Sequence, residues 1–219
     1  MVVKGQFLER PTLIPVGELV LDGVAHRGHK RPAVLVLPPP AFEGGGMDHV
    51  VGAEVAYAVS REGHSTVRFN YRGVGGSQGK VSRKVEDWLL DAGEALKLAA
   101  DNAGGGPVVL VAIGASDAVA LRLAQTLPGT VVGIALVNPT VLQPAELAQV
   151  SGVEWEIIFP EHQPVDRLAW SNALTALGHG LTLIPGADRS YQRNLPLVGQ
   201  AVVHLLQRVS GSLSAAPTH

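Results

Sequence analysis

The sequence predicts an α/β fold with a doubly wound, mostly parallel sheet and an antiparallel hairpin at one edge. Short apolar runs alternate along the chain with longer segments of helical period, which is the pattern of strand-helix-strand units. Hydrophobic residues make up 46% of the 219 residues and charged residues only 16%, against about 25% charged in typical proteins. Much of the chain must therefore face inward, as it does when helices cover both faces of a sheet.

The elements are predicted from the apolar pattern, taken in order. In "GELVLDGVAHRG" at 17–28, Asp22-Gly23 separates two short alternating runs and indicates a hairpin with a type I′ turn. The later elements are strands at 33–37, 65–69, 107–113, 131–137, 153–159 and 181–184, and helices at 49–63, 83–103, 118–127, 163–177 and 195–209.

Length and composition bound the domain count. We expect a single domain over residues 1–210, because a chain of this length buries a large core without dividing. The last nine residues, "GSLSAAPTH" at 211–219, are small and polar without periodicity, and we expect them to form a flexible tail.

Charge and cysteine content exclude several classes of protein. The net charge is −2, from 17 basic and 19 acidic residues without a basic block, which argues against nucleic acid and anionic membranes as partners. Cysteine is absent, so disulfides, thiolate catalysis and zinc-thiolate sites are excluded. Charged residues interrupt the N-terminus, so no signal peptide is expected there. We expect a cytoplasmic protein with no cofactor and no metal.

Ser116 is the first candidate site residue. It follows the apolar run "VVLVAI" within "IGASDA" and precedes the helical segment "AVALRLAQTL". A serine at the turn from a buried strand to a buried helix is a candidate nucleophile. It needs a base to take its proton and an acid to orient that base.

Three further blocks carry a resemblance to a known family: "LPPPAFEGGGM" at 37–47, "RFNYRGVGGSQG" at 68–79 and "PGADRSY" at 185–191. In this order and spacing they resemble the small α/β-hydrolases without a lid that are related to dienelactone hydrolase. The resemblance covers about residues 17–209. It implies the α/β-hydrolase fold, serine esterase chemistry and Ser116 at the nucleophile elbow, although Ala118 replaces the second elbow glycine.

The same resemblance implies that two members of the catalytic triad are replaced. Gln163 stands where the family has its acid, and Arg189 stands where it has its histidine. A guanidinium has no acceptor and stays protonated, so Arg189 cannot serve as the base. Glutamine carries no charge to stabilise an imidazolium, a defect of about four powers of ten in the serine protease triad.

The oxyanion hole implied by the resemblance takes one N–H from Asp117, the residue after the nucleophile, and one from the loop after the first parallel strand. That loop begins with three prolines at 38–40. Ala41 supplies the second donor if the register places it there, whereas Pro40 has no N–H to give. The Asp117 carboxylate would oppose an oxyanion unless it is turned away or paired.

These observations favour a non-catalytic or weakly active relative that binds a small ligand. The pocket would lie between the loops at 38–49, 72–78, 116–118, 160–165 and 187–191, and Arg189 would bind a carboxylate or phosphate. One alternative is an active hydrolase of esters, lactones or thioesters with an unrecognised base, for which His162 beside Glu161 is a candidate. The other alternative is a protein-interaction module.

Overall fold

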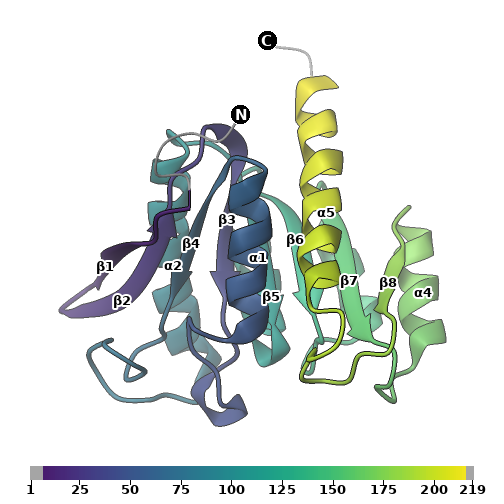
Figure 1. Cartoon of the computed structure of the whole chain (residues 1–219), viewed down its shortest axis with the longest axis horizontal. Coiled ribbons are helices and arrows are strands. Elements are labelled where there is room, and N and C mark those ends of the chain that lie inside the picture. Colours follow the sequence, from purple (N-terminus) through teal and green to yellow (C-terminus); the bar gives the residue numbers. More distant parts are fainter. Residues whose placement is uncertain (1–6, 216–219) are drawn as a thin grey trace.

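The computed structural model describes residues 7–215 and contains one eight-stranded sheet. The strands lie in the order β1-β2-β4-β3-β5-β6-β7-β8, and helices connect the parallel strands (Figure 1). β2 pairs antiparallel with both β1 and β4, whereas the other neighbouring strands pair in parallel. The predicted doubly wound sheet with an antiparallel edge is confirmed.

The strands and helices predicted after the hairpin are all present, with bounds that shift by a few residues. The strands are β1 (Arg10–Val16), β2 (Leu19–His26), β3 (Lys30–Leu37), β4 (His64–Phe69), β5 (Val108–Ile113), β6 (Val131–Val137), β7 (Glu154–Pro160) and β8 (Leu181–Ile184). The α-helices are α1 (Val50–Arg61), α2 (Val85–Asn102), α3 (Asp117–Thr126), α4 (Arg167–Ala176) and α5 (Pro196–Ala215). Three short 3-10 segments are η1 (Ala41–Glu43), η2 (Gly114–Ser116) and η3 (Pro144–Gln149).

The edge hairpin turns at Gly17-Glu18, so the prediction of a turn at Asp22-Gly23 is wrong. β2 runs straight through both residues. The Asp22 carboxylate accepts two hydrogen bonds from the segment that follows β4. A Cβ at Gly23 would lie 2.8 Å from the backbone oxygen of Arg68. Asp22 and Gly23 therefore contact β4 and the loop that follows it, and they do not form a turn.

The last helix is longer than predicted. α5 ends at Ala215, so residues 211–215 of the predicted tail are helical. In Figure 1, α5 projects beyond the edge of the sheet toward the C-terminus. The remaining predicted tail, 216–219, lies outside the described residues.

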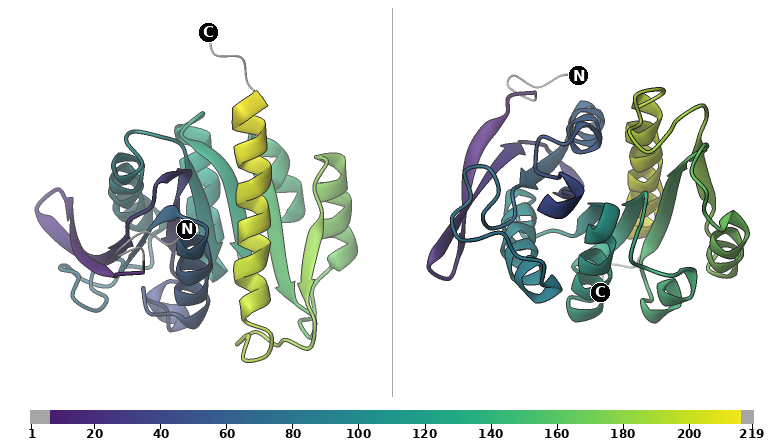
Figure 2. Two further views of the ribbon diagram at one scale, coloured as in Figure 1. Left: turned by 45° about the horizontal axis from the view of Figure 1, so that its top comes forward. Right: turned by 90° about the horizontal axis from the view of Figure 1, so that it is seen from below.

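Helices cover both faces of the sheet, as the apolar strands require. α1 and α5 pack on one face, and α2, α3 and α4 on the other (Figure 2). Along β5, Val109 and Val111 face the core beneath α1 and α5, while Leu110 and Ala112 face the opposite core. This alternation is the two-residue period of a strand, and it explains why β5 carries no polar residue.

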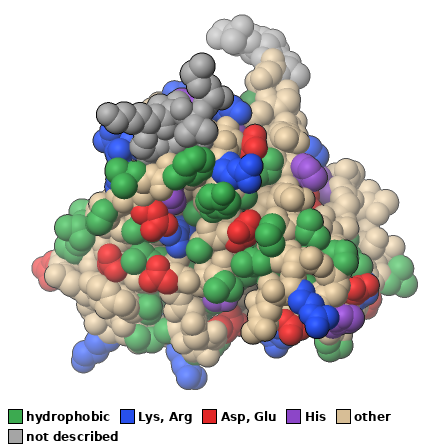
Figure 3. Space-filling model, viewed as in Figure 1, with side chains coloured by type: hydrophobic (Ala, Val, Ile, Leu, Met, Phe, Trp, Pro, Cys, Tyr) green, Lys and Arg blue, Asp and Glu red, His purple; other side chains and the backbone are tan. Residues whose placement is uncertain are grey.

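The face of the molecule shown in Figure 3 has no large patch of one charge. Over α1 and α5, acidic, basic and hydrophobic side chains are interspersed rather than gathered by kind (Figure 3). Within residues 7–215, no helix combines the length and the apolar character needed to cross a bilayer. The cytoplasmic location expected from the sequence stays a prediction.

Candidate functional site

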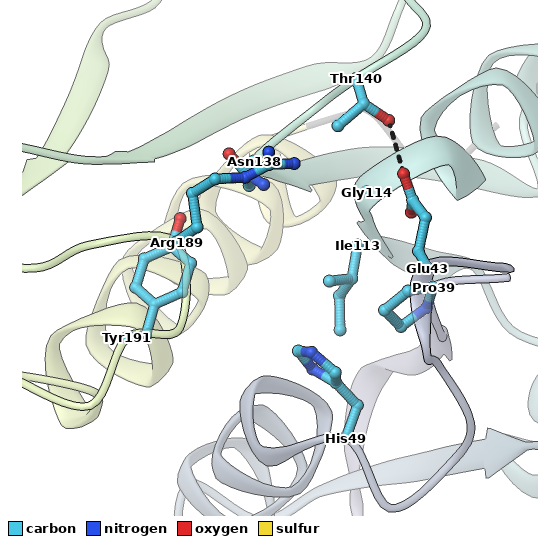
Figure 4. Close-up of a pocket in the computed structure, with 9 residues that line it drawn as sticks. All are labelled: Pro39, Glu43, His49, Ile113, Gly114, Asn138, Thr140, Arg189 and Tyr191. Atoms are coloured by element: carbon cyan, nitrogen blue, oxygen red, sulfur yellow. Dashed lines mark hydrogen bonds between the residues drawn. The ribbon is translucent and has the colours of Figure 1, made fainter. Parts of the chain in front are cut away.

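A pocket of about 300 Å³ opens at the carboxyl ends of the central strands, where ligands bind in open α/β sheets (Figure 4). Loops 38–49 and 187–191 contribute as predicted, but 72–78, 116–118 and 160–165 do not line it. The segment after β6 contributes instead, which the sequence did not predict. The lining residues are Pro39, Glu43, His49, Ile113, Gly114, Asn138, Thr140, Arg189 and Tyr191.

Ser116 lies in the core beneath this pocket. Its side chain is fully buried, and its hydroxyl donates a hydrogen bond of 2.6 Å to the carbonyl oxygen of Pro38. The Tyr71 hydroxyl is 3.0 Å away on another side. The backbone of Ser116 is ordinary helix, with φ −72° and ψ −5°. The hydroxyl therefore joins three buried segments and holds its proton on a backbone carbonyl.

Gly114 is the residue at which β5 turns into the pocket. Its φ of +59° lies in the left-handed region that favours glycine. A Cβ built on Gly114 would lie 2.2 Å from Oε2 of Glu43. The residue with the left-handed backbone thus has no side chain, and the Glu43 carboxylate fills the space that a side chain at position 114 would occupy.

Glu43 reaches this position from η1, the turn that follows the three prolines. Its Oε2 accepts a hydrogen bond of 3.0 Å from the Ala115 backbone N–H. Its Oε1 accepts one of 3.2 Å from the Thr140 hydroxyl, the bond drawn in Figure 4. One carboxylate therefore links the loops that follow β3, β5 and β6. No pattern in the sequence singles out Glu43.

Asp117 is fully buried and organises the loop after β6. One carboxylate oxygen accepts from the backbone N–H groups of Thr140, Val141 and Leu142, at 2.7, 2.8 and 3.1 Å. Burial raises the pKa of the Asp117 carboxyl, and its hydrogen bonds from N–H groups act in the opposite direction. The carboxylate is thus turned away from the pocket and paired. The backbone N–H of Asp117, a predicted oxyanion donor, bonds to the carbonyl of Gly114.

The residues predicted around the acid position are not brought together with Ser116. His162 is exposed, and the hydrogen bonds of the Ser116 hydroxyl go elsewhere. The Glu161 carboxylate accepts 2.7 Å from the Gly186 N–H. Gln163 is half-buried, and its Oε1 is a buried acceptor without a partner in the described part of the chain.

Arg189 is the one predicted site residue that lines the pocket. It lies in the loop after β8, and in Figure 4 its side chain extends toward Asn138. Among residues 7–215 the guanidinium has no hydrogen-bond or ion-pair partner. Ala41, the other predicted oxyanion donor, begins η1 and accepts a hydrogen bond from the Gly44 N–H at 3.0 Å. It does not line the pocket.

Two further polar side chains line the pocket with unpartnered buried atoms. These atoms are Nδ1 of His49 and Oδ1 of Asn138. Burial lowers the pKa of the His49 imidazole, and the negative charge of Glu43 partly opposes this. Asn138 is only 9% exposed and has a φ of +55°, an uncommon conformation outside glycine. It is the first residue after β6. Ligand-binding residues of open α/β sheets lie at the carboxyl ends of the strands, so this position could have been predicted from the sequence.

The two arginines of the 68–79 block are held by other parts of the protein. Arg72 pairs with Asp91 at 2.7 Å and with Asp87 at 3.0 Å. Arg68 is buried, donates to the carbonyl oxygen of Met47 at 2.7 Å and pairs with Glu9. Each guanidinium therefore ties a strand end to another segment.

The sheet order, the helices on both faces and the pocket at the strand ends define an α/β-hydrolase fold. A family model described as serine aminopeptidase, S33, matches residues 40–174, and the chain belongs to this family of α/β hydrolases. No curated protein sequence matches the chain.

Solved structures share this fold. An α/β serine hydrolase homologue from Coxiella burnetii is similar with a TM-score of 0.74 and 21% identity, covering 90% of this chain and 97% of that one. An α/β serine hydrolase without a lid from Xanthomonas campestris has a TM-score of 0.72 and 22% identity, covering 91% and 94%. At these identities the likeness concerns the fold, and the predicted α/β-hydrolase fold without a lid is confirmed.

Proposed function

We propose that this chain is a non-hydrolytic member of its family that binds a small anionic ligand in the pocket. The observation that carries the proposal is the glycine at the turn after β5. The alternative of an active serine hydrolase makes opposite predictions for the same experiments.

The backbone at the turn supports Gly114 as the residue in the nucleophile's place. In this fold the nucleophile sits at a sharp, strained turn from strand to helix, within the spacing G-x-S-x-G. Gly114 has the strained backbone, at φ +59°, whereas Ser116 is helical. With Gly114 in the middle, the small residues two positions away on either side are Ala112 and Ser116. The turn then keeps its shape and lacks a nucleophile.

Glu43 gives independent support. The first oxyanion donor in this fold is the N–H of the residue after the nucleophile, which is Ala115 in this correspondence. That N–H already donates to the Glu43 carboxylate at 3.0 Å. A fixed negative charge there disfavours the developing oxyanion of acyl transfer.

The remaining triad positions point the same way. By the family resemblance, Gln163 and Arg189 replace the acid and the histidine, so neither a charged orienting group nor a proton acceptor is supplied. Arg189 instead presents a permanent cation to the pocket, and guanidinium groups bind carboxylates and phosphates in bidentate geometry.

Hydrolysis is tested with p-nitrophenyl acetate and a fluorophosphonate probe, on wild-type protein, Ser116→Ala and the matched exposed-serine variant Ser171→Ala. We expect turnover no greater than that of heat-unfolded protein, and no labelling in any of the three. Clear turnover together with labelling that is lost only in Ser116→Ala would overturn the proposal.

Anion binding is tested by calorimetric titration with acetate and inorganic phosphate. We expect Arg189→Ala to weaken binding at least about tenfold, which corresponds to about 1.4 kcal/mol. Arg193→Ala is the matched control, because Arg193 is exposed nearby and does not line the pocket. Binding that Arg189→Ala leaves unchanged would contradict this part of the proposal.

A further inference from the structure

The pocket carries two opposite charges that neither neutralise each other nor pair with another residue. Within residues 7–215, no ion pair involves Glu43 or Arg189. The partners of the Glu43 carboxylate are neutral donors, the Ala115 N–H and the Thr140 hydroxyl. In Figure 4 the two charged side chains extend into the pocket from different sides, from the loop after β3 and the loop after β8. The fold thus holds a cation and an anion apart across one cavity.

Two buried polar atoms without partners belong to side chains that line the same pocket. Oδ1 of Asn138 is an acceptor without a donor, on a side chain that is nine-tenths buried. Nδ1 of His49 is likewise buried and unpaired. A buried polar atom left without a hydrogen bond costs about 1 to 3 kcal/mol. In a pocket of this size, ordered water or a bound molecule supplies the missing partners, and a ligand that replaces the water must offer the same hydrogen bonds.

The chemistry of these groups defines what that molecule must carry. Asn138 Oδ1 lacks a donor, and the charge of Glu43, whose oxygens accept only from neutral groups, favours a cationic one. Arg189 requires an anion. Pro39, Ile113 and the ring of Tyr191 supply apolar surface in the same pocket, suited to a short hydrocarbon segment. A volume of about 300 Å³ is at the small end of ligand pockets.

We propose that the pocket binds a small zwitterion of the amino-acid type, with its carboxylate on Arg189 and its ammonium group between Glu43 and Asn138. This inference rests on the proposed function, because the same pocket must bind rather than hydrolyse. The inference adds a positively charged group to the ligand, whereas anion binding by Arg189 alone requires only a negative one.

The test uses a ladder of probes: glycine, 3-aminopropanoate, 4-aminobutanoate, 5-aminopentanoate and 6-aminohexanoate. Each is titrated calorimetrically beside the alkanoate and the alkylamine of the same length. We expect at least one ω-amino acid to bind with a Kd of about 1 mM or tighter. Its two singly charged counterparts should bind at least about tenfold more weakly, and the preferred length reports the spacing of the charges.

Two variants separate the charges without removing hydrogen bonds. Glu43→Gln keeps an oxygen for the Ala115 N–H and an amide for Thr140, and it should weaken the amino acid tenfold or more while leaving the alkanoate unchanged. Arg189→Gln should weaken both the amino acid and the alkanoate. Glu18→Gln and Arg193→Gln, at exposed positions outside the pocket, should change neither.

The outcomes distinguish this inference from the proposed function. If the alkanoate binds as tightly as the amino acid and Glu43→Gln has no effect, the zwitterion is wrong and anion binding stands. If no ω-amino acid binds at a ligand concentration of 50 times the expected Kd, the proposal of a zwitterionic ligand is also overturned. The proposed function is then judged by the acetate, phosphate and fluorophosphonate experiments alone.

Discussion

Two groups of charged side chains lie near the carboxyl ends of the strands. In one group the opposite charges form ion pairs, and in the other they do not. Beside α2, the Arg72 guanidinium makes hydrogen bonds to Asp91 and Asp87, and Asp91 is completely buried. In the pocket, Arg189 and Glu43 have no charged partner among the described residues. Because buried charges normally occur paired, the first group needs no ligand to explain it. Glu43 and Arg189 are exposed, so solvent hydrates both charges, and both stay accessible to a ligand that enters the pocket.

The largest expected effect comes from breaking the paired group. Asp91→Ala removes the partner of a mostly buried guanidinium and an acceptor for the Arg72 backbone N–H at 2.9 Å. We expect a loss of about 3 to 5 kcal/mol in the free energy of unfolding, measured by urea denaturation. Asp101→Ala, at an exposed position on the same helix, should stay within about 0.5 kcal/mol. A small effect of Asp91→Ala would mean that the two groups do not differ as described.

A smaller effect is expected at the turn after β5. Gly114→Ser adds a side chain at φ +59° and pushes against the Glu43 carboxylate. We expect it to cost about 2 to 3 kcal/mol and to produce no esterase activity. Gly129→Ser has the same kind of backbone, at φ +81°, with no atom within 4 Å of the added Cβ, and should cost about 1 kcal/mol.

The difference between these glycine variants isolates the contact with Glu43. Gly114→Ser combined with Glu43→Ala should therefore recover part of the lost stability, by the same denaturation measurement. Equal costs at 114 and 129, with no recovery in the double variant, would show that Glu43 does not occupy the space beside the turn.

The smallest expected effect concerns two histidines, His64, which is buried, and His49, which is half-buried and lines the pocket. Burial lowers the pKa of both His64 and His49, with a hydrogen bond to Pro32 opposing this at His64 and the charge of Glu43 opposing it at His49. The folded state then binds fewer protons than the unfolded state below the unfolded pKa of about 6.5. Stability should be fully present above pH 6.5 and fall as the pH drops toward each lowered pKa.

Urea midpoints between pH 7.5 and 5 measure this slope, and His64→Gln or His49→Gln should each reduce it. At pH 7.5 only His64→Gln should be destabilising, because His64 Nδ1 is 2.8 Å from the carbonyl oxygen of Pro32 and His49 Nδ1 has no partner. A slope unchanged by either variant would contradict the assignment of the lowered pKa values.

The sequence predicted the architecture well because burial on both sheet faces leaves a strong apolar signal. β5 illustrates this, since alternate residues enter two different cores and the run contains no polar residue. The position of the hairpin turn was predicted wrongly for the opposite reason. Asp22-Gly23 is a common turn dipeptide, but here distant contacts with β4 and its loop determine its use, and these have no local signature.

The site was predicted only in part. Taken as the centre, Ser116 fits the G-x-S-x-G spacing except for Ala118 in place of the second glycine. The competing centre at Gly114 becomes visible only through its backbone angle and its place in the pocket lining. Glu43 and Asn138 depend on loops that meet in space from β3 and β6. A signal existed for Asn138, which directly follows an apolar strand. For Glu43 no pattern in the chain predicts the 3.0 Å bond to Ala115.

The turn η1 joins the pocket to an aromatic pair formed by the exposed Phe42 and the buried Trp88. While Glu43 enters the pocket, its neighbour Phe42 stacks on Trp88 with ring centroids 5.7 Å apart and planes inclined by 30°. The other two tryptophans, Trp155 and Trp170, lie in strand β7 and helix α4. Any ligand that draws Glu43 away and shifts this turn also alters the indole environment of Trp88. A ligand that moves the turn in this way would then be detectable through the intrinsic fluorescence of Trp88.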